Sequence, residues 1–153
     1  MIGRMGVIYG YYAAADDEDA ARAVVREDGE PTGTGYDEVA VKGIDPVVDL
    51  LRAEMLITGR SAEAVKADPR HGDLIAMVGE GEVVSVTLTD AFRDELARFD
   101  KELLHDVAQG WAASGDFHQP PEPENLAAFL RDLSGLAERA AARGRRLYCW
   151  MSV

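Results

Sequence analysis

The sequence predicts an α+β domain in which about five helices cover a single small sheet. Two observations lead to this prediction. Runs of apolar, β-branched and aromatic residues, which are typical of strands, occur near the start, in the middle and near the end of the chain. The segments between these runs repeat their apolar residues at spacings of three and four, which is the period of an amphipathic helix.

The clearest pattern lies in the middle of the chain. Residues 83–88 read Val-Val-Ser-Val-Thr-Leu, which suits a pleated and largely buried strand. Thr89 follows as a helix N-cap, and Asp90 places negative charge at the positive end of the helix dipole. An amphipathic segment then continues to Leu104, with apolar residues at spacings of four, three and four: Phe92, Leu96, Phe99 and Leu103. This stretch therefore predicts a strand, a cap and a helix in that order.

The first strand is predicted at residues 7–13, after a short preamble at residues 1–4. Because side chains alternate between the two faces of a strand, Tyr9 and Tyr11 share one face and Tyr12 points to the other. If the first and last strands are neighbours in the sheet, their aromatic side chains gather on it.

The next elements are bounded by caps and loop-forming residues. A helix is predicted from Asp16 to about Arg26, and residues 28–36 form a loop by composition. Residues 38–44 suit a short strand at a sheet edge. A second helix is predicted over residues 45–58, with proline in its first turn and glycine after its last residue.

The second half of the chain alternates helices with loops. Helices are predicted at residues 61–67, at 100–113 behind a bend, and at 124–143, which is the longest. Residues 114–123 are rich in glycine and proline and form a loop. The apolar run at residues 74–78 is too short to assign to either class.

The last strand is predicted at residues 147–151. Its apolar side chains fall on both faces, with Leu147 and Cys149 on one face and Tyr148 and Trp150 on the other. A strand of this kind belongs in the interior of a sheet. We therefore expect Trp150 to be largely buried and Cys149 to be protected from solvent.

Composition narrows the class of protein. A chain of 153 residues is the size of one domain, and no apolar run approaches the ~18 residues of a membrane span. The formal charge of −12 disfavours nucleic acid as a partner and favours a basic protein partner. A single cysteine and the lack of a signal-like N-terminus predict a cytoplasmic protein. The 13 arginines against 3 lysines are typical of a GC-rich bacterial genome.

Four short segments resemble the YfbM-like family of small bacterial proteins, a domain of unknown function. They are Met5-Gly6-Val7-Ile8-Tyr9-Gly10-Tyr11-Tyr12, Leu56-Ile57-Thr58-Gly59, Val86-Thr87-Leu88-Thr89 and Ala140-Ala141-Ala142-Arg143-Gly144. The resemblance implies one YfbM-like α+β domain over residues 5–153. The chain departs from the family at Val48, Leu50 and Glu54, where the family places Lys, Trp and His. The resemblance therefore implies a fold and carries over no activity.

Motifs for metals and cofactors are missing from the sequence. The three histidines lie in different segments without the spacing of a ligand pair. The acidic run from Asp16 resembles a calcium loop but has Ala21 where the sharp turn requires glycine, so helix capping explains it better. The glycine-rich segments at residues 32–35 and 79–81 lack the remaining residues of a phosphate-binding loop. We predict neither a metal nor a cofactor.

The candidate functional residues fall into two groups. Aromatic side chains suited either to a ligand or to the core are Tyr9, Tyr11, Tyr12, Trp111, Tyr148 and Trp150. His105 or His118, with Asp106 or Asp116, is the weak candidate for an acid–base pair. We favour a non-enzymatic acidic protein-interaction domain, either a toxin-neutralising or a regulatory partner. The alternatives are a small enzyme that uses the histidine–carboxylate pair and a small-molecule binder with an aromatic pocket.

Overall fold

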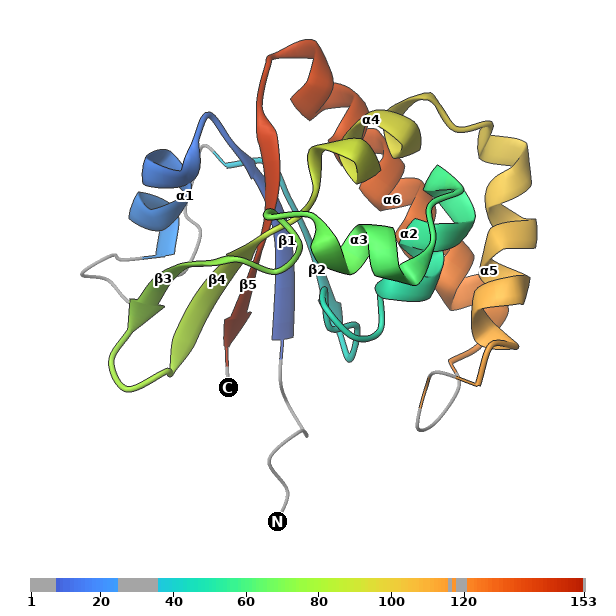
Figure 1. Ribbon diagram of the computed structural model, residues 1–153, viewed down its shortest axis with the longest axis horizontal. Coiled ribbons are helices and arrows are strands. Elements are labelled where there is room, and N and C mark those ends of the chain that lie inside the picture. Colours follow the sequence, from blue (N-terminus) through green and yellow to red (C-terminus); the bar gives the residue numbers. More distant parts are fainter. Residues whose placement is uncertain (1–7, 25–35, 116, 118–120, 153) are drawn as a thin grey trace.

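The computed structural model describes residues 8–24, 36–115, 117 and 121–152. It shows one antiparallel sheet of five strands in the order β2-β1-β5-β4-β3, with helices on both sides, which confirms an α+β fold with a single sheet (Figure 1). The strands are β1 (Ile8–Ala14), β2 (Glu38–Lys42), β3 (Leu74–Val78), β4 (Val83–Thr87) and β5 (Arg146–Ser152).

The strand β5 lies at the centre of the sheet. It pairs with β1 on one side, where Cys149 lies opposite Tyr11, and with β4 on the other, where Cys149 lies opposite Val86. The first and last strands are therefore neighbours, and both faces of β5 are covered. Trp150 is buried, with 7 % of its surface exposed, as its place in the sequence predicts.

Six α-helices and one 3₁₀ turn lie among the described residues. They are α1 (Asp17–Val24), α2 (Leu51–Thr58), α3 (Ala62–Ala67), α4 (Asp90–Arg98), the turn Lys101–Leu103, α5 (Leu104–Ala112) and α6 (Pro123–Ala142). Among the described helices, α1 alone packs on one face of the sheet, while α2, α4, α5 and α6 form the larger core on the other face (Figure 1). Because the larger core contains most of the apolar side chains, it supplies most of the hydrophobic stabilisation.

Several boundaries differ from the sequence-based expectation. Residues 46–50 form turns, so the second helix begins at Leu51, six residues later than the pattern predicts. The unassigned run at residues 74–78 is the strand β3, an antiparallel partner of β4. The central helix ends at Arg98, because Phe99 is extended and a 3₁₀ turn follows. The predicted preamble and most of the predicted 28–36 loop lie outside the described residues.

No helix in the described part of the chain is both long enough and apolar enough to cross a membrane.

Candidate functional site

The six candidate aromatic residues are all buried, but they do not share one face of the sheet. Tyr9, Tyr11 and Trp111 belong to the larger core, which lies under α2, α4, α5 and α6. Tyr12, Tyr148 and Trp150 belong to the smaller core under α1. The aromatic cluster predicted from the sequence is therefore split by the sheet, and neither half forms an open pocket.

The polar atoms of two of these side chains hold one turn in place. The Tyr11 hydroxyl donates a hydrogen bond of 2.6 Å to the Ile44 carbonyl, and the Trp111 indole N–H donates one of 2.8 Å to the Asp49 carbonyl. The two bonds fix both ends of the segment from residue 44 to residue 49. Buried tyrosine and tryptophan need such partners for their polar atoms.

The aromatic residues on the opposite face anchor α1 and β2. Tyr12 donates to the Ala20 carbonyl at 2.8 Å, and Tyr148 donates to the Asp17 carboxylate at 2.6 Å. Trp150 donates from its indole N–H to Glu38 at 3.0 Å. Burial raises the pKa of both Tyr12 and Tyr148, so each phenol stays protonated and able to donate.

The candidate acid–base residues do not form a site in the described part of the chain. His105 and its neighbour Asp106 are exposed on α5. His118 and Asp116 lie outside the described residues. Within the described ranges, no group of three or more histidine, cysteine or acidic residues is placed to hold a metal ion.

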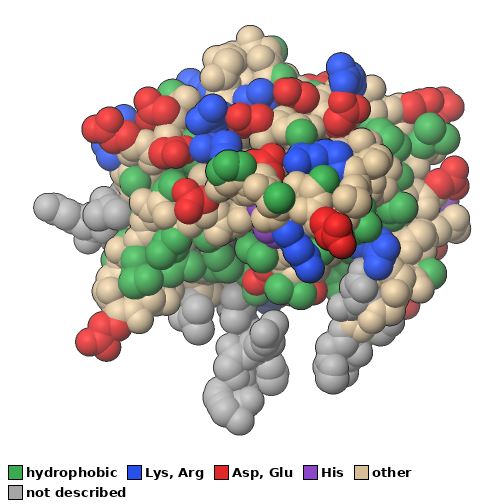
Figure 2. All heavy atoms as spheres, viewed as in Figure 1, with side chains coloured by type: hydrophobic (Ala, Val, Ile, Leu, Met, Phe, Trp, Pro, Cys, Tyr) green, Lys and Arg blue, Asp and Glu red, His purple; other side chains and the backbone are tan. Residues whose placement is uncertain are grey.

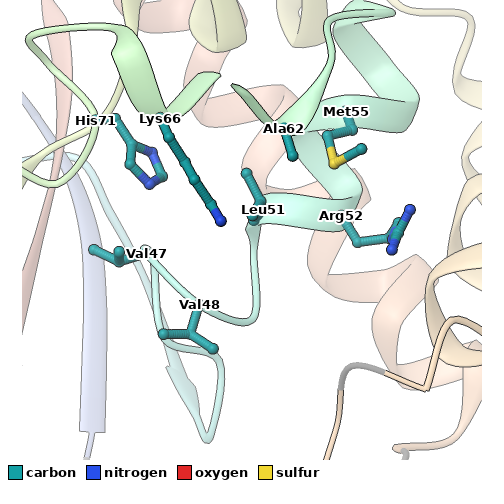
Figure 3. Close-up of a pocket in the computed structure, with 8 residues that line it drawn as sticks. All are labelled: Val47, Val48, Leu51, Arg52, Met55, Ala62, Lys66 and His71. Atoms are coloured by element: carbon teal, nitrogen blue, oxygen red, sulfur yellow. The ribbon is translucent and has the colours of Figure 1, made fainter. Parts of the chain in front are cut away.

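The structure instead shows an open groove that the sequence analysis did not identify. It has a volume of about 620 Å³ and lies between the segment that leads into α2, the helix α3 and the loop that precedes β3 (Figure 3). The groove is lined by Val47, Val48, Leu51, Arg52, Met55, Ala62, Lys66 and His71. It is separate from all six candidate aromatic residues.

Helix α2 and the turns that lead into it form the groove because together they carry apolar side chains on two sides. Leu50, Ala53 and Ile57 are buried in the core. A second series at spacings of four faces the groove instead: Val47, Leu51 and Met55. A helix that covers a core needs only one apolar stripe. The second apolar stripe of this segment could therefore have indicated the groove from the sequence. The stripe does not identify the ligand that covers it.

The apolar entrance to α2 is held rigidly. The Asp45 carboxylate accepts the backbone N–H of Val47 at 2.8 Å and of Val48 at 2.9 Å. The Asp49 carboxylate accepts the N–H of Asp45 at 2.9 Å. Together with the hydrogen bonds from Tyr11 and Trp111, these bonds fix the backbone that carries Val47 and Val48.

The wall opposite α2 is the short helix α3. The Ser61 hydroxyl caps it by accepting the N–H of Ala64 at 3.1 Å, and Val65 is buried. The Arg60 guanidinium forms an ion pair with Asp68 at 3.4 Å, across the ends of the helix. This arrangement anchors α3 on its inner side and leaves Lys66 exposed at the groove.

The loop that carries His71 is tied to β4. The Thr87 hydroxyl donates to the Arg70 carbonyl at 2.5 Å, and the Thr87 carbonyl accepts the N–H of Gly72 at 3.1 Å. Gly72 has a φ of +65°, and a Cβ atom added there would lie 2.5 Å from Cγ2 of Val47. Only glycine suits this position, because it allows both the left-handed backbone and the close approach of Val47.

The groove differs in charge from the rest of the chain. None of its eight lining side chains is acidic, whereas two are cationic, Arg52 and Lys66. Burial and the nearby Lys66 charge lower the pKa of His71, although Asp68 partly opposes the shift. His71 is therefore predominantly neutral at pH 7. A chain of net charge −12 thus presents a groove that is apolar and locally positive.

An apolar strip lies beside the groove on the same face of the sheet. Leu74 and Met77 of β3 are 51 % and 53 % exposed. They lie opposite Val86 and Val84 of β4, whose side chains share the face of the larger core. Figure 2 shows hydrophobic side chains gathered over the β3–β4 region, beside the positive and histidine side chains near the centre of the view. The helices of the larger core leave this part of the sheet open.

The lining of the groove is mostly apolar, with Arg52, Lys66 and His71 as its polar side chains. An apolar floor with a few polar groups is typical of a binding site.

Comparisons with known proteins give no relative: no family model matches the chain, and neither the curated proteins nor the solved structures contain a significant match. The resemblance to the YfbM-like family therefore stays a prediction that rests on the four quoted segments.

Proposed function

We propose that this chain is a non-enzymatic protein-interaction domain and that the groove between α2 and α3 receives a segment of the partner protein. The observation that carries the proposal is the continuity of exposed apolar surface. The groove is lined by Val47, Leu51, Met55 and the 65 % exposed Val48. The loop of His71 and Gly72, which packs against Val47, leads from the groove directly to the strip of Leu74 and Met77.

Exposed apolar side chains gathered on one face mark interaction sites, because a soluble protein otherwise hides such a surface. The side chains of the groove and the strip are also held by rigid backbone, through the Asp45 cap, the Thr87 bonds and the paired strand β3. A rigid surface loses little conformational entropy when a partner binds.

A small molecule is the second candidate ligand, favoured by the groove volume of about 620 Å³. Sites for small ligands have volumes of roughly 300–1,000 Å³. We favour a protein because the exposed apolar surface continues past the groove onto β3. The proposal includes membership of the YfbM-like family. In the cytoplasm, the protein would act as a regulatory or toxin-neutralising partner. A basic partner, favoured by the net charge of −12, would then contact the acidic outer surface.

Site-specific photo-crosslinking in the native cells tests this proposal. A photoreactive phenylalanine analogue replaces Val48 at the groove, and the same analogue replaces Leu103 as the control. Leu103 is apolar and 47 % exposed, but it lies on the 3₁₀ turn outside the groove. We expect one adduct of discrete mass from position 48 and none from position 103.

A second substitution links the adduct to the groove itself. Met55→Glu places a negative charge on the groove floor and should abolish the adduct at position 48, while thermal unfolding followed by circular dichroism reports whether the variant is folded. An adduct that forms equally at both positions, or that survives Met55→Glu in the folded protein, would contradict the proposed docking site. A shift of only a few hundred daltons would instead support the small-molecule alternative.

A further inference from the structure

The charge of the groove indicates which kind of segment it accepts. We infer that the partner segment is acidic and amphipathic: it places apolar side chains on the groove floor and aspartate or glutamate carboxylates against Lys66 and Arg52. This inference rests on the proposed function and adds the chemistry of the partner.

The two cations stand on different walls of the groove. Lys66 comes from α3 and Arg52 from α2, and Figure 3 shows the apolar side chain of Leu51 between them, with Met55 above Arg52. A ligand that covers the apolar floor therefore brings its flanks close to positive charge on both sides. Carboxylates at those flanks would form charge-assisted hydrogen bonds.

Lys66 is available for such a contact. In the described part of the chain it forms no ion pair, whereas Lys101 pairs with Glu138. The position is notable because the chain has 28 acidic residues against 16 basic ones. Among the described residues, no acidic side chain lines the groove. Lys66 is thus the groove cation that is available to a ligand from outside the domain.

The net negative charge of the domain does not prevent acidic binding. Salt screens charges beyond a Debye length of about 8 Å at physiological ionic strength. Contacts at Lys66 and Arg52 act within that distance, whereas acidic groups on the far side of the domain do not. A basic segment would lose this local match, because it would place positive charge beside two cations in an apolar groove.

The probe for the test is a library of random peptides displayed on phage. It is selected on the wild-type domain and depleted on the Lys66→Glu variant, and the recovered peptides are then synthesised with a fluorescent label. We expect peptides in which aliphatic or aromatic residues alternate with aspartate and glutamate. Their affinity, measured by fluorescence anisotropy, should fall about tenfold in Lys66→Glu and by a smaller factor in Lys66→Gln.

The chain supplies a matched control for the charge reversal. Lys42 is exposed on β2 and lies outside the groove, so Lys42→Glu changes the net charge by the same amount and should leave the affinity unchanged. Replacing the peptide carboxylates by lysine should restore binding to the Lys66→Glu domain. With only three lysines in the chain, amine-reactive labelling gives a further readout: the bound peptide should protect Lys66 but not Lys42 or Lys101.

The outcomes separate the inference from the proposed function. If the recovered peptides are neutral or basic, bind Lys66→Glu as well as the wild type, and lose binding on Met55→Glu, the acidic-segment inference is wrong and the docking site remains. If no recovered peptide depends on Met55, both are contradicted. An effect of Lys42→Glu equal to that of Lys66→Glu would show a general charge effect and would also overturn the inference.

Discussion

The Thr89 hydroxyl donates a hydrogen bond of 2.6 Å to the carboxylate of Glu54, and both side chains are buried. The same hydroxyl accepts the backbone N–H of Phe92 at 3.2 Å and so caps α4. One threonine therefore joins the start of α4 to α2, the helix that forms the groove floor. Burial raises the pKa of Glu54, although the bond from Thr89 and the charge of Arg60 oppose the shift.

The first prediction concerns Glu54 and pH. Because the pKa of Glu54 is raised in the folded state, folding favours its protonated form. This stabilisation is complete below the unfolded pKa, near 4.5, and is lost as the pH rises through the folded pKa. Glu54→Gln retains an acceptor for Thr89 and has no charge. We expect urea unfolding to show that the variant gains stability relative to the parent as the pH rises from about 4 to 7.

Thr89→Val is the complementary change. It leaves the buried Glu54 carboxylate without its donor and removes the cap of α4, so it should lower the free energy of unfolding by about 1–3 kcal/mol at pH 7. The loss should be smaller in a Glu54→Gln background. Equal losses in both backgrounds would show that Glu54 and Thr89 act independently.

The second prediction concerns Gly10 and Trp150. They lie opposite each other on β1 and β5, and a Cβ atom added at Gly10 would lie 2.1 Å from the indole ring. Gly10→Ala should therefore destabilise the domain by about 1–3 kcal/mol, and Trp150→Ala by about 3–5 kcal/mol. In the double variant, Gly10→Ala should lower the free energy of unfolding little further than Trp150→Ala alone. Chemical denaturation of all four proteins gives the coupling energy, and simple additivity would contradict the contact.

The third prediction concerns Trp111 and the groove entrance. Trp111→Phe removes the indole N–H that binds the Asp49 carbonyl and should cost about 1–2 kcal/mol. Hydrogen exchange should become faster at the amides of Val47 and Val48, because the turn that carries them loses one of its anchors. Trp150→Phe serves as the control, since its indole bonds to Glu38 on the opposite face. Unchanged exchange in Trp111→Phe would show that the Asp45 cap and the other bonds of the turn hold it without Trp111.

The fourth prediction concerns Cys149, the single cysteine of the chain. Its thiol is fully buried at the centre of the sheet, and burial raises its pKa, so the reactive thiolate is scarce. A colourless disulfide reagent that releases a coloured thiol should label it slowly in the native protein and rapidly in concentrated denaturant. The native rate should follow global unfolding. Immediate labelling without denaturant would place β5 at the surface.

The strands and caps were predictable because local sequence determines them. The aromatic and β-branched residues of β1, the β-branched run of β4 and the cap at Thr89 need no distant partner to be identified. The run at residues 74–78 could not be assigned because five residues show too little periodicity, and only pairing with β4 makes it a strand. The place of β3 at the edge of the sheet is a tertiary property.

The candidate site was less predictable than the fold. Residue type marked Tyr11 and Trp111 as candidate ligand contacts, but their polar atoms are satisfied by the carbonyls of Ile44 and Asp49 inside the protein. Conversely, His71 looked isolated in the sequence because Lys66 and Val47, which line the same groove, come from other segments. Sequence patterns report which side chains can serve a site, whereas the groove depends on three segments that meet only in the folded chain.

The position of β5 has a consequence for how the domain folds. The two sheet halves, β2 with β1 and β4 with β3, form from nearby segments, but they make no direct pairing with each other. Residues 146–152 must enter between them, and the register brings Ile8 opposite Ser152. Long-range pairing of this kind slows folding and leaves unpaired strand edges exposed until it is complete. During synthesis both halves exist before β5 does, so the nascent chain passes through a stage at which its two strand pairs are open to aggregation or to a chaperone.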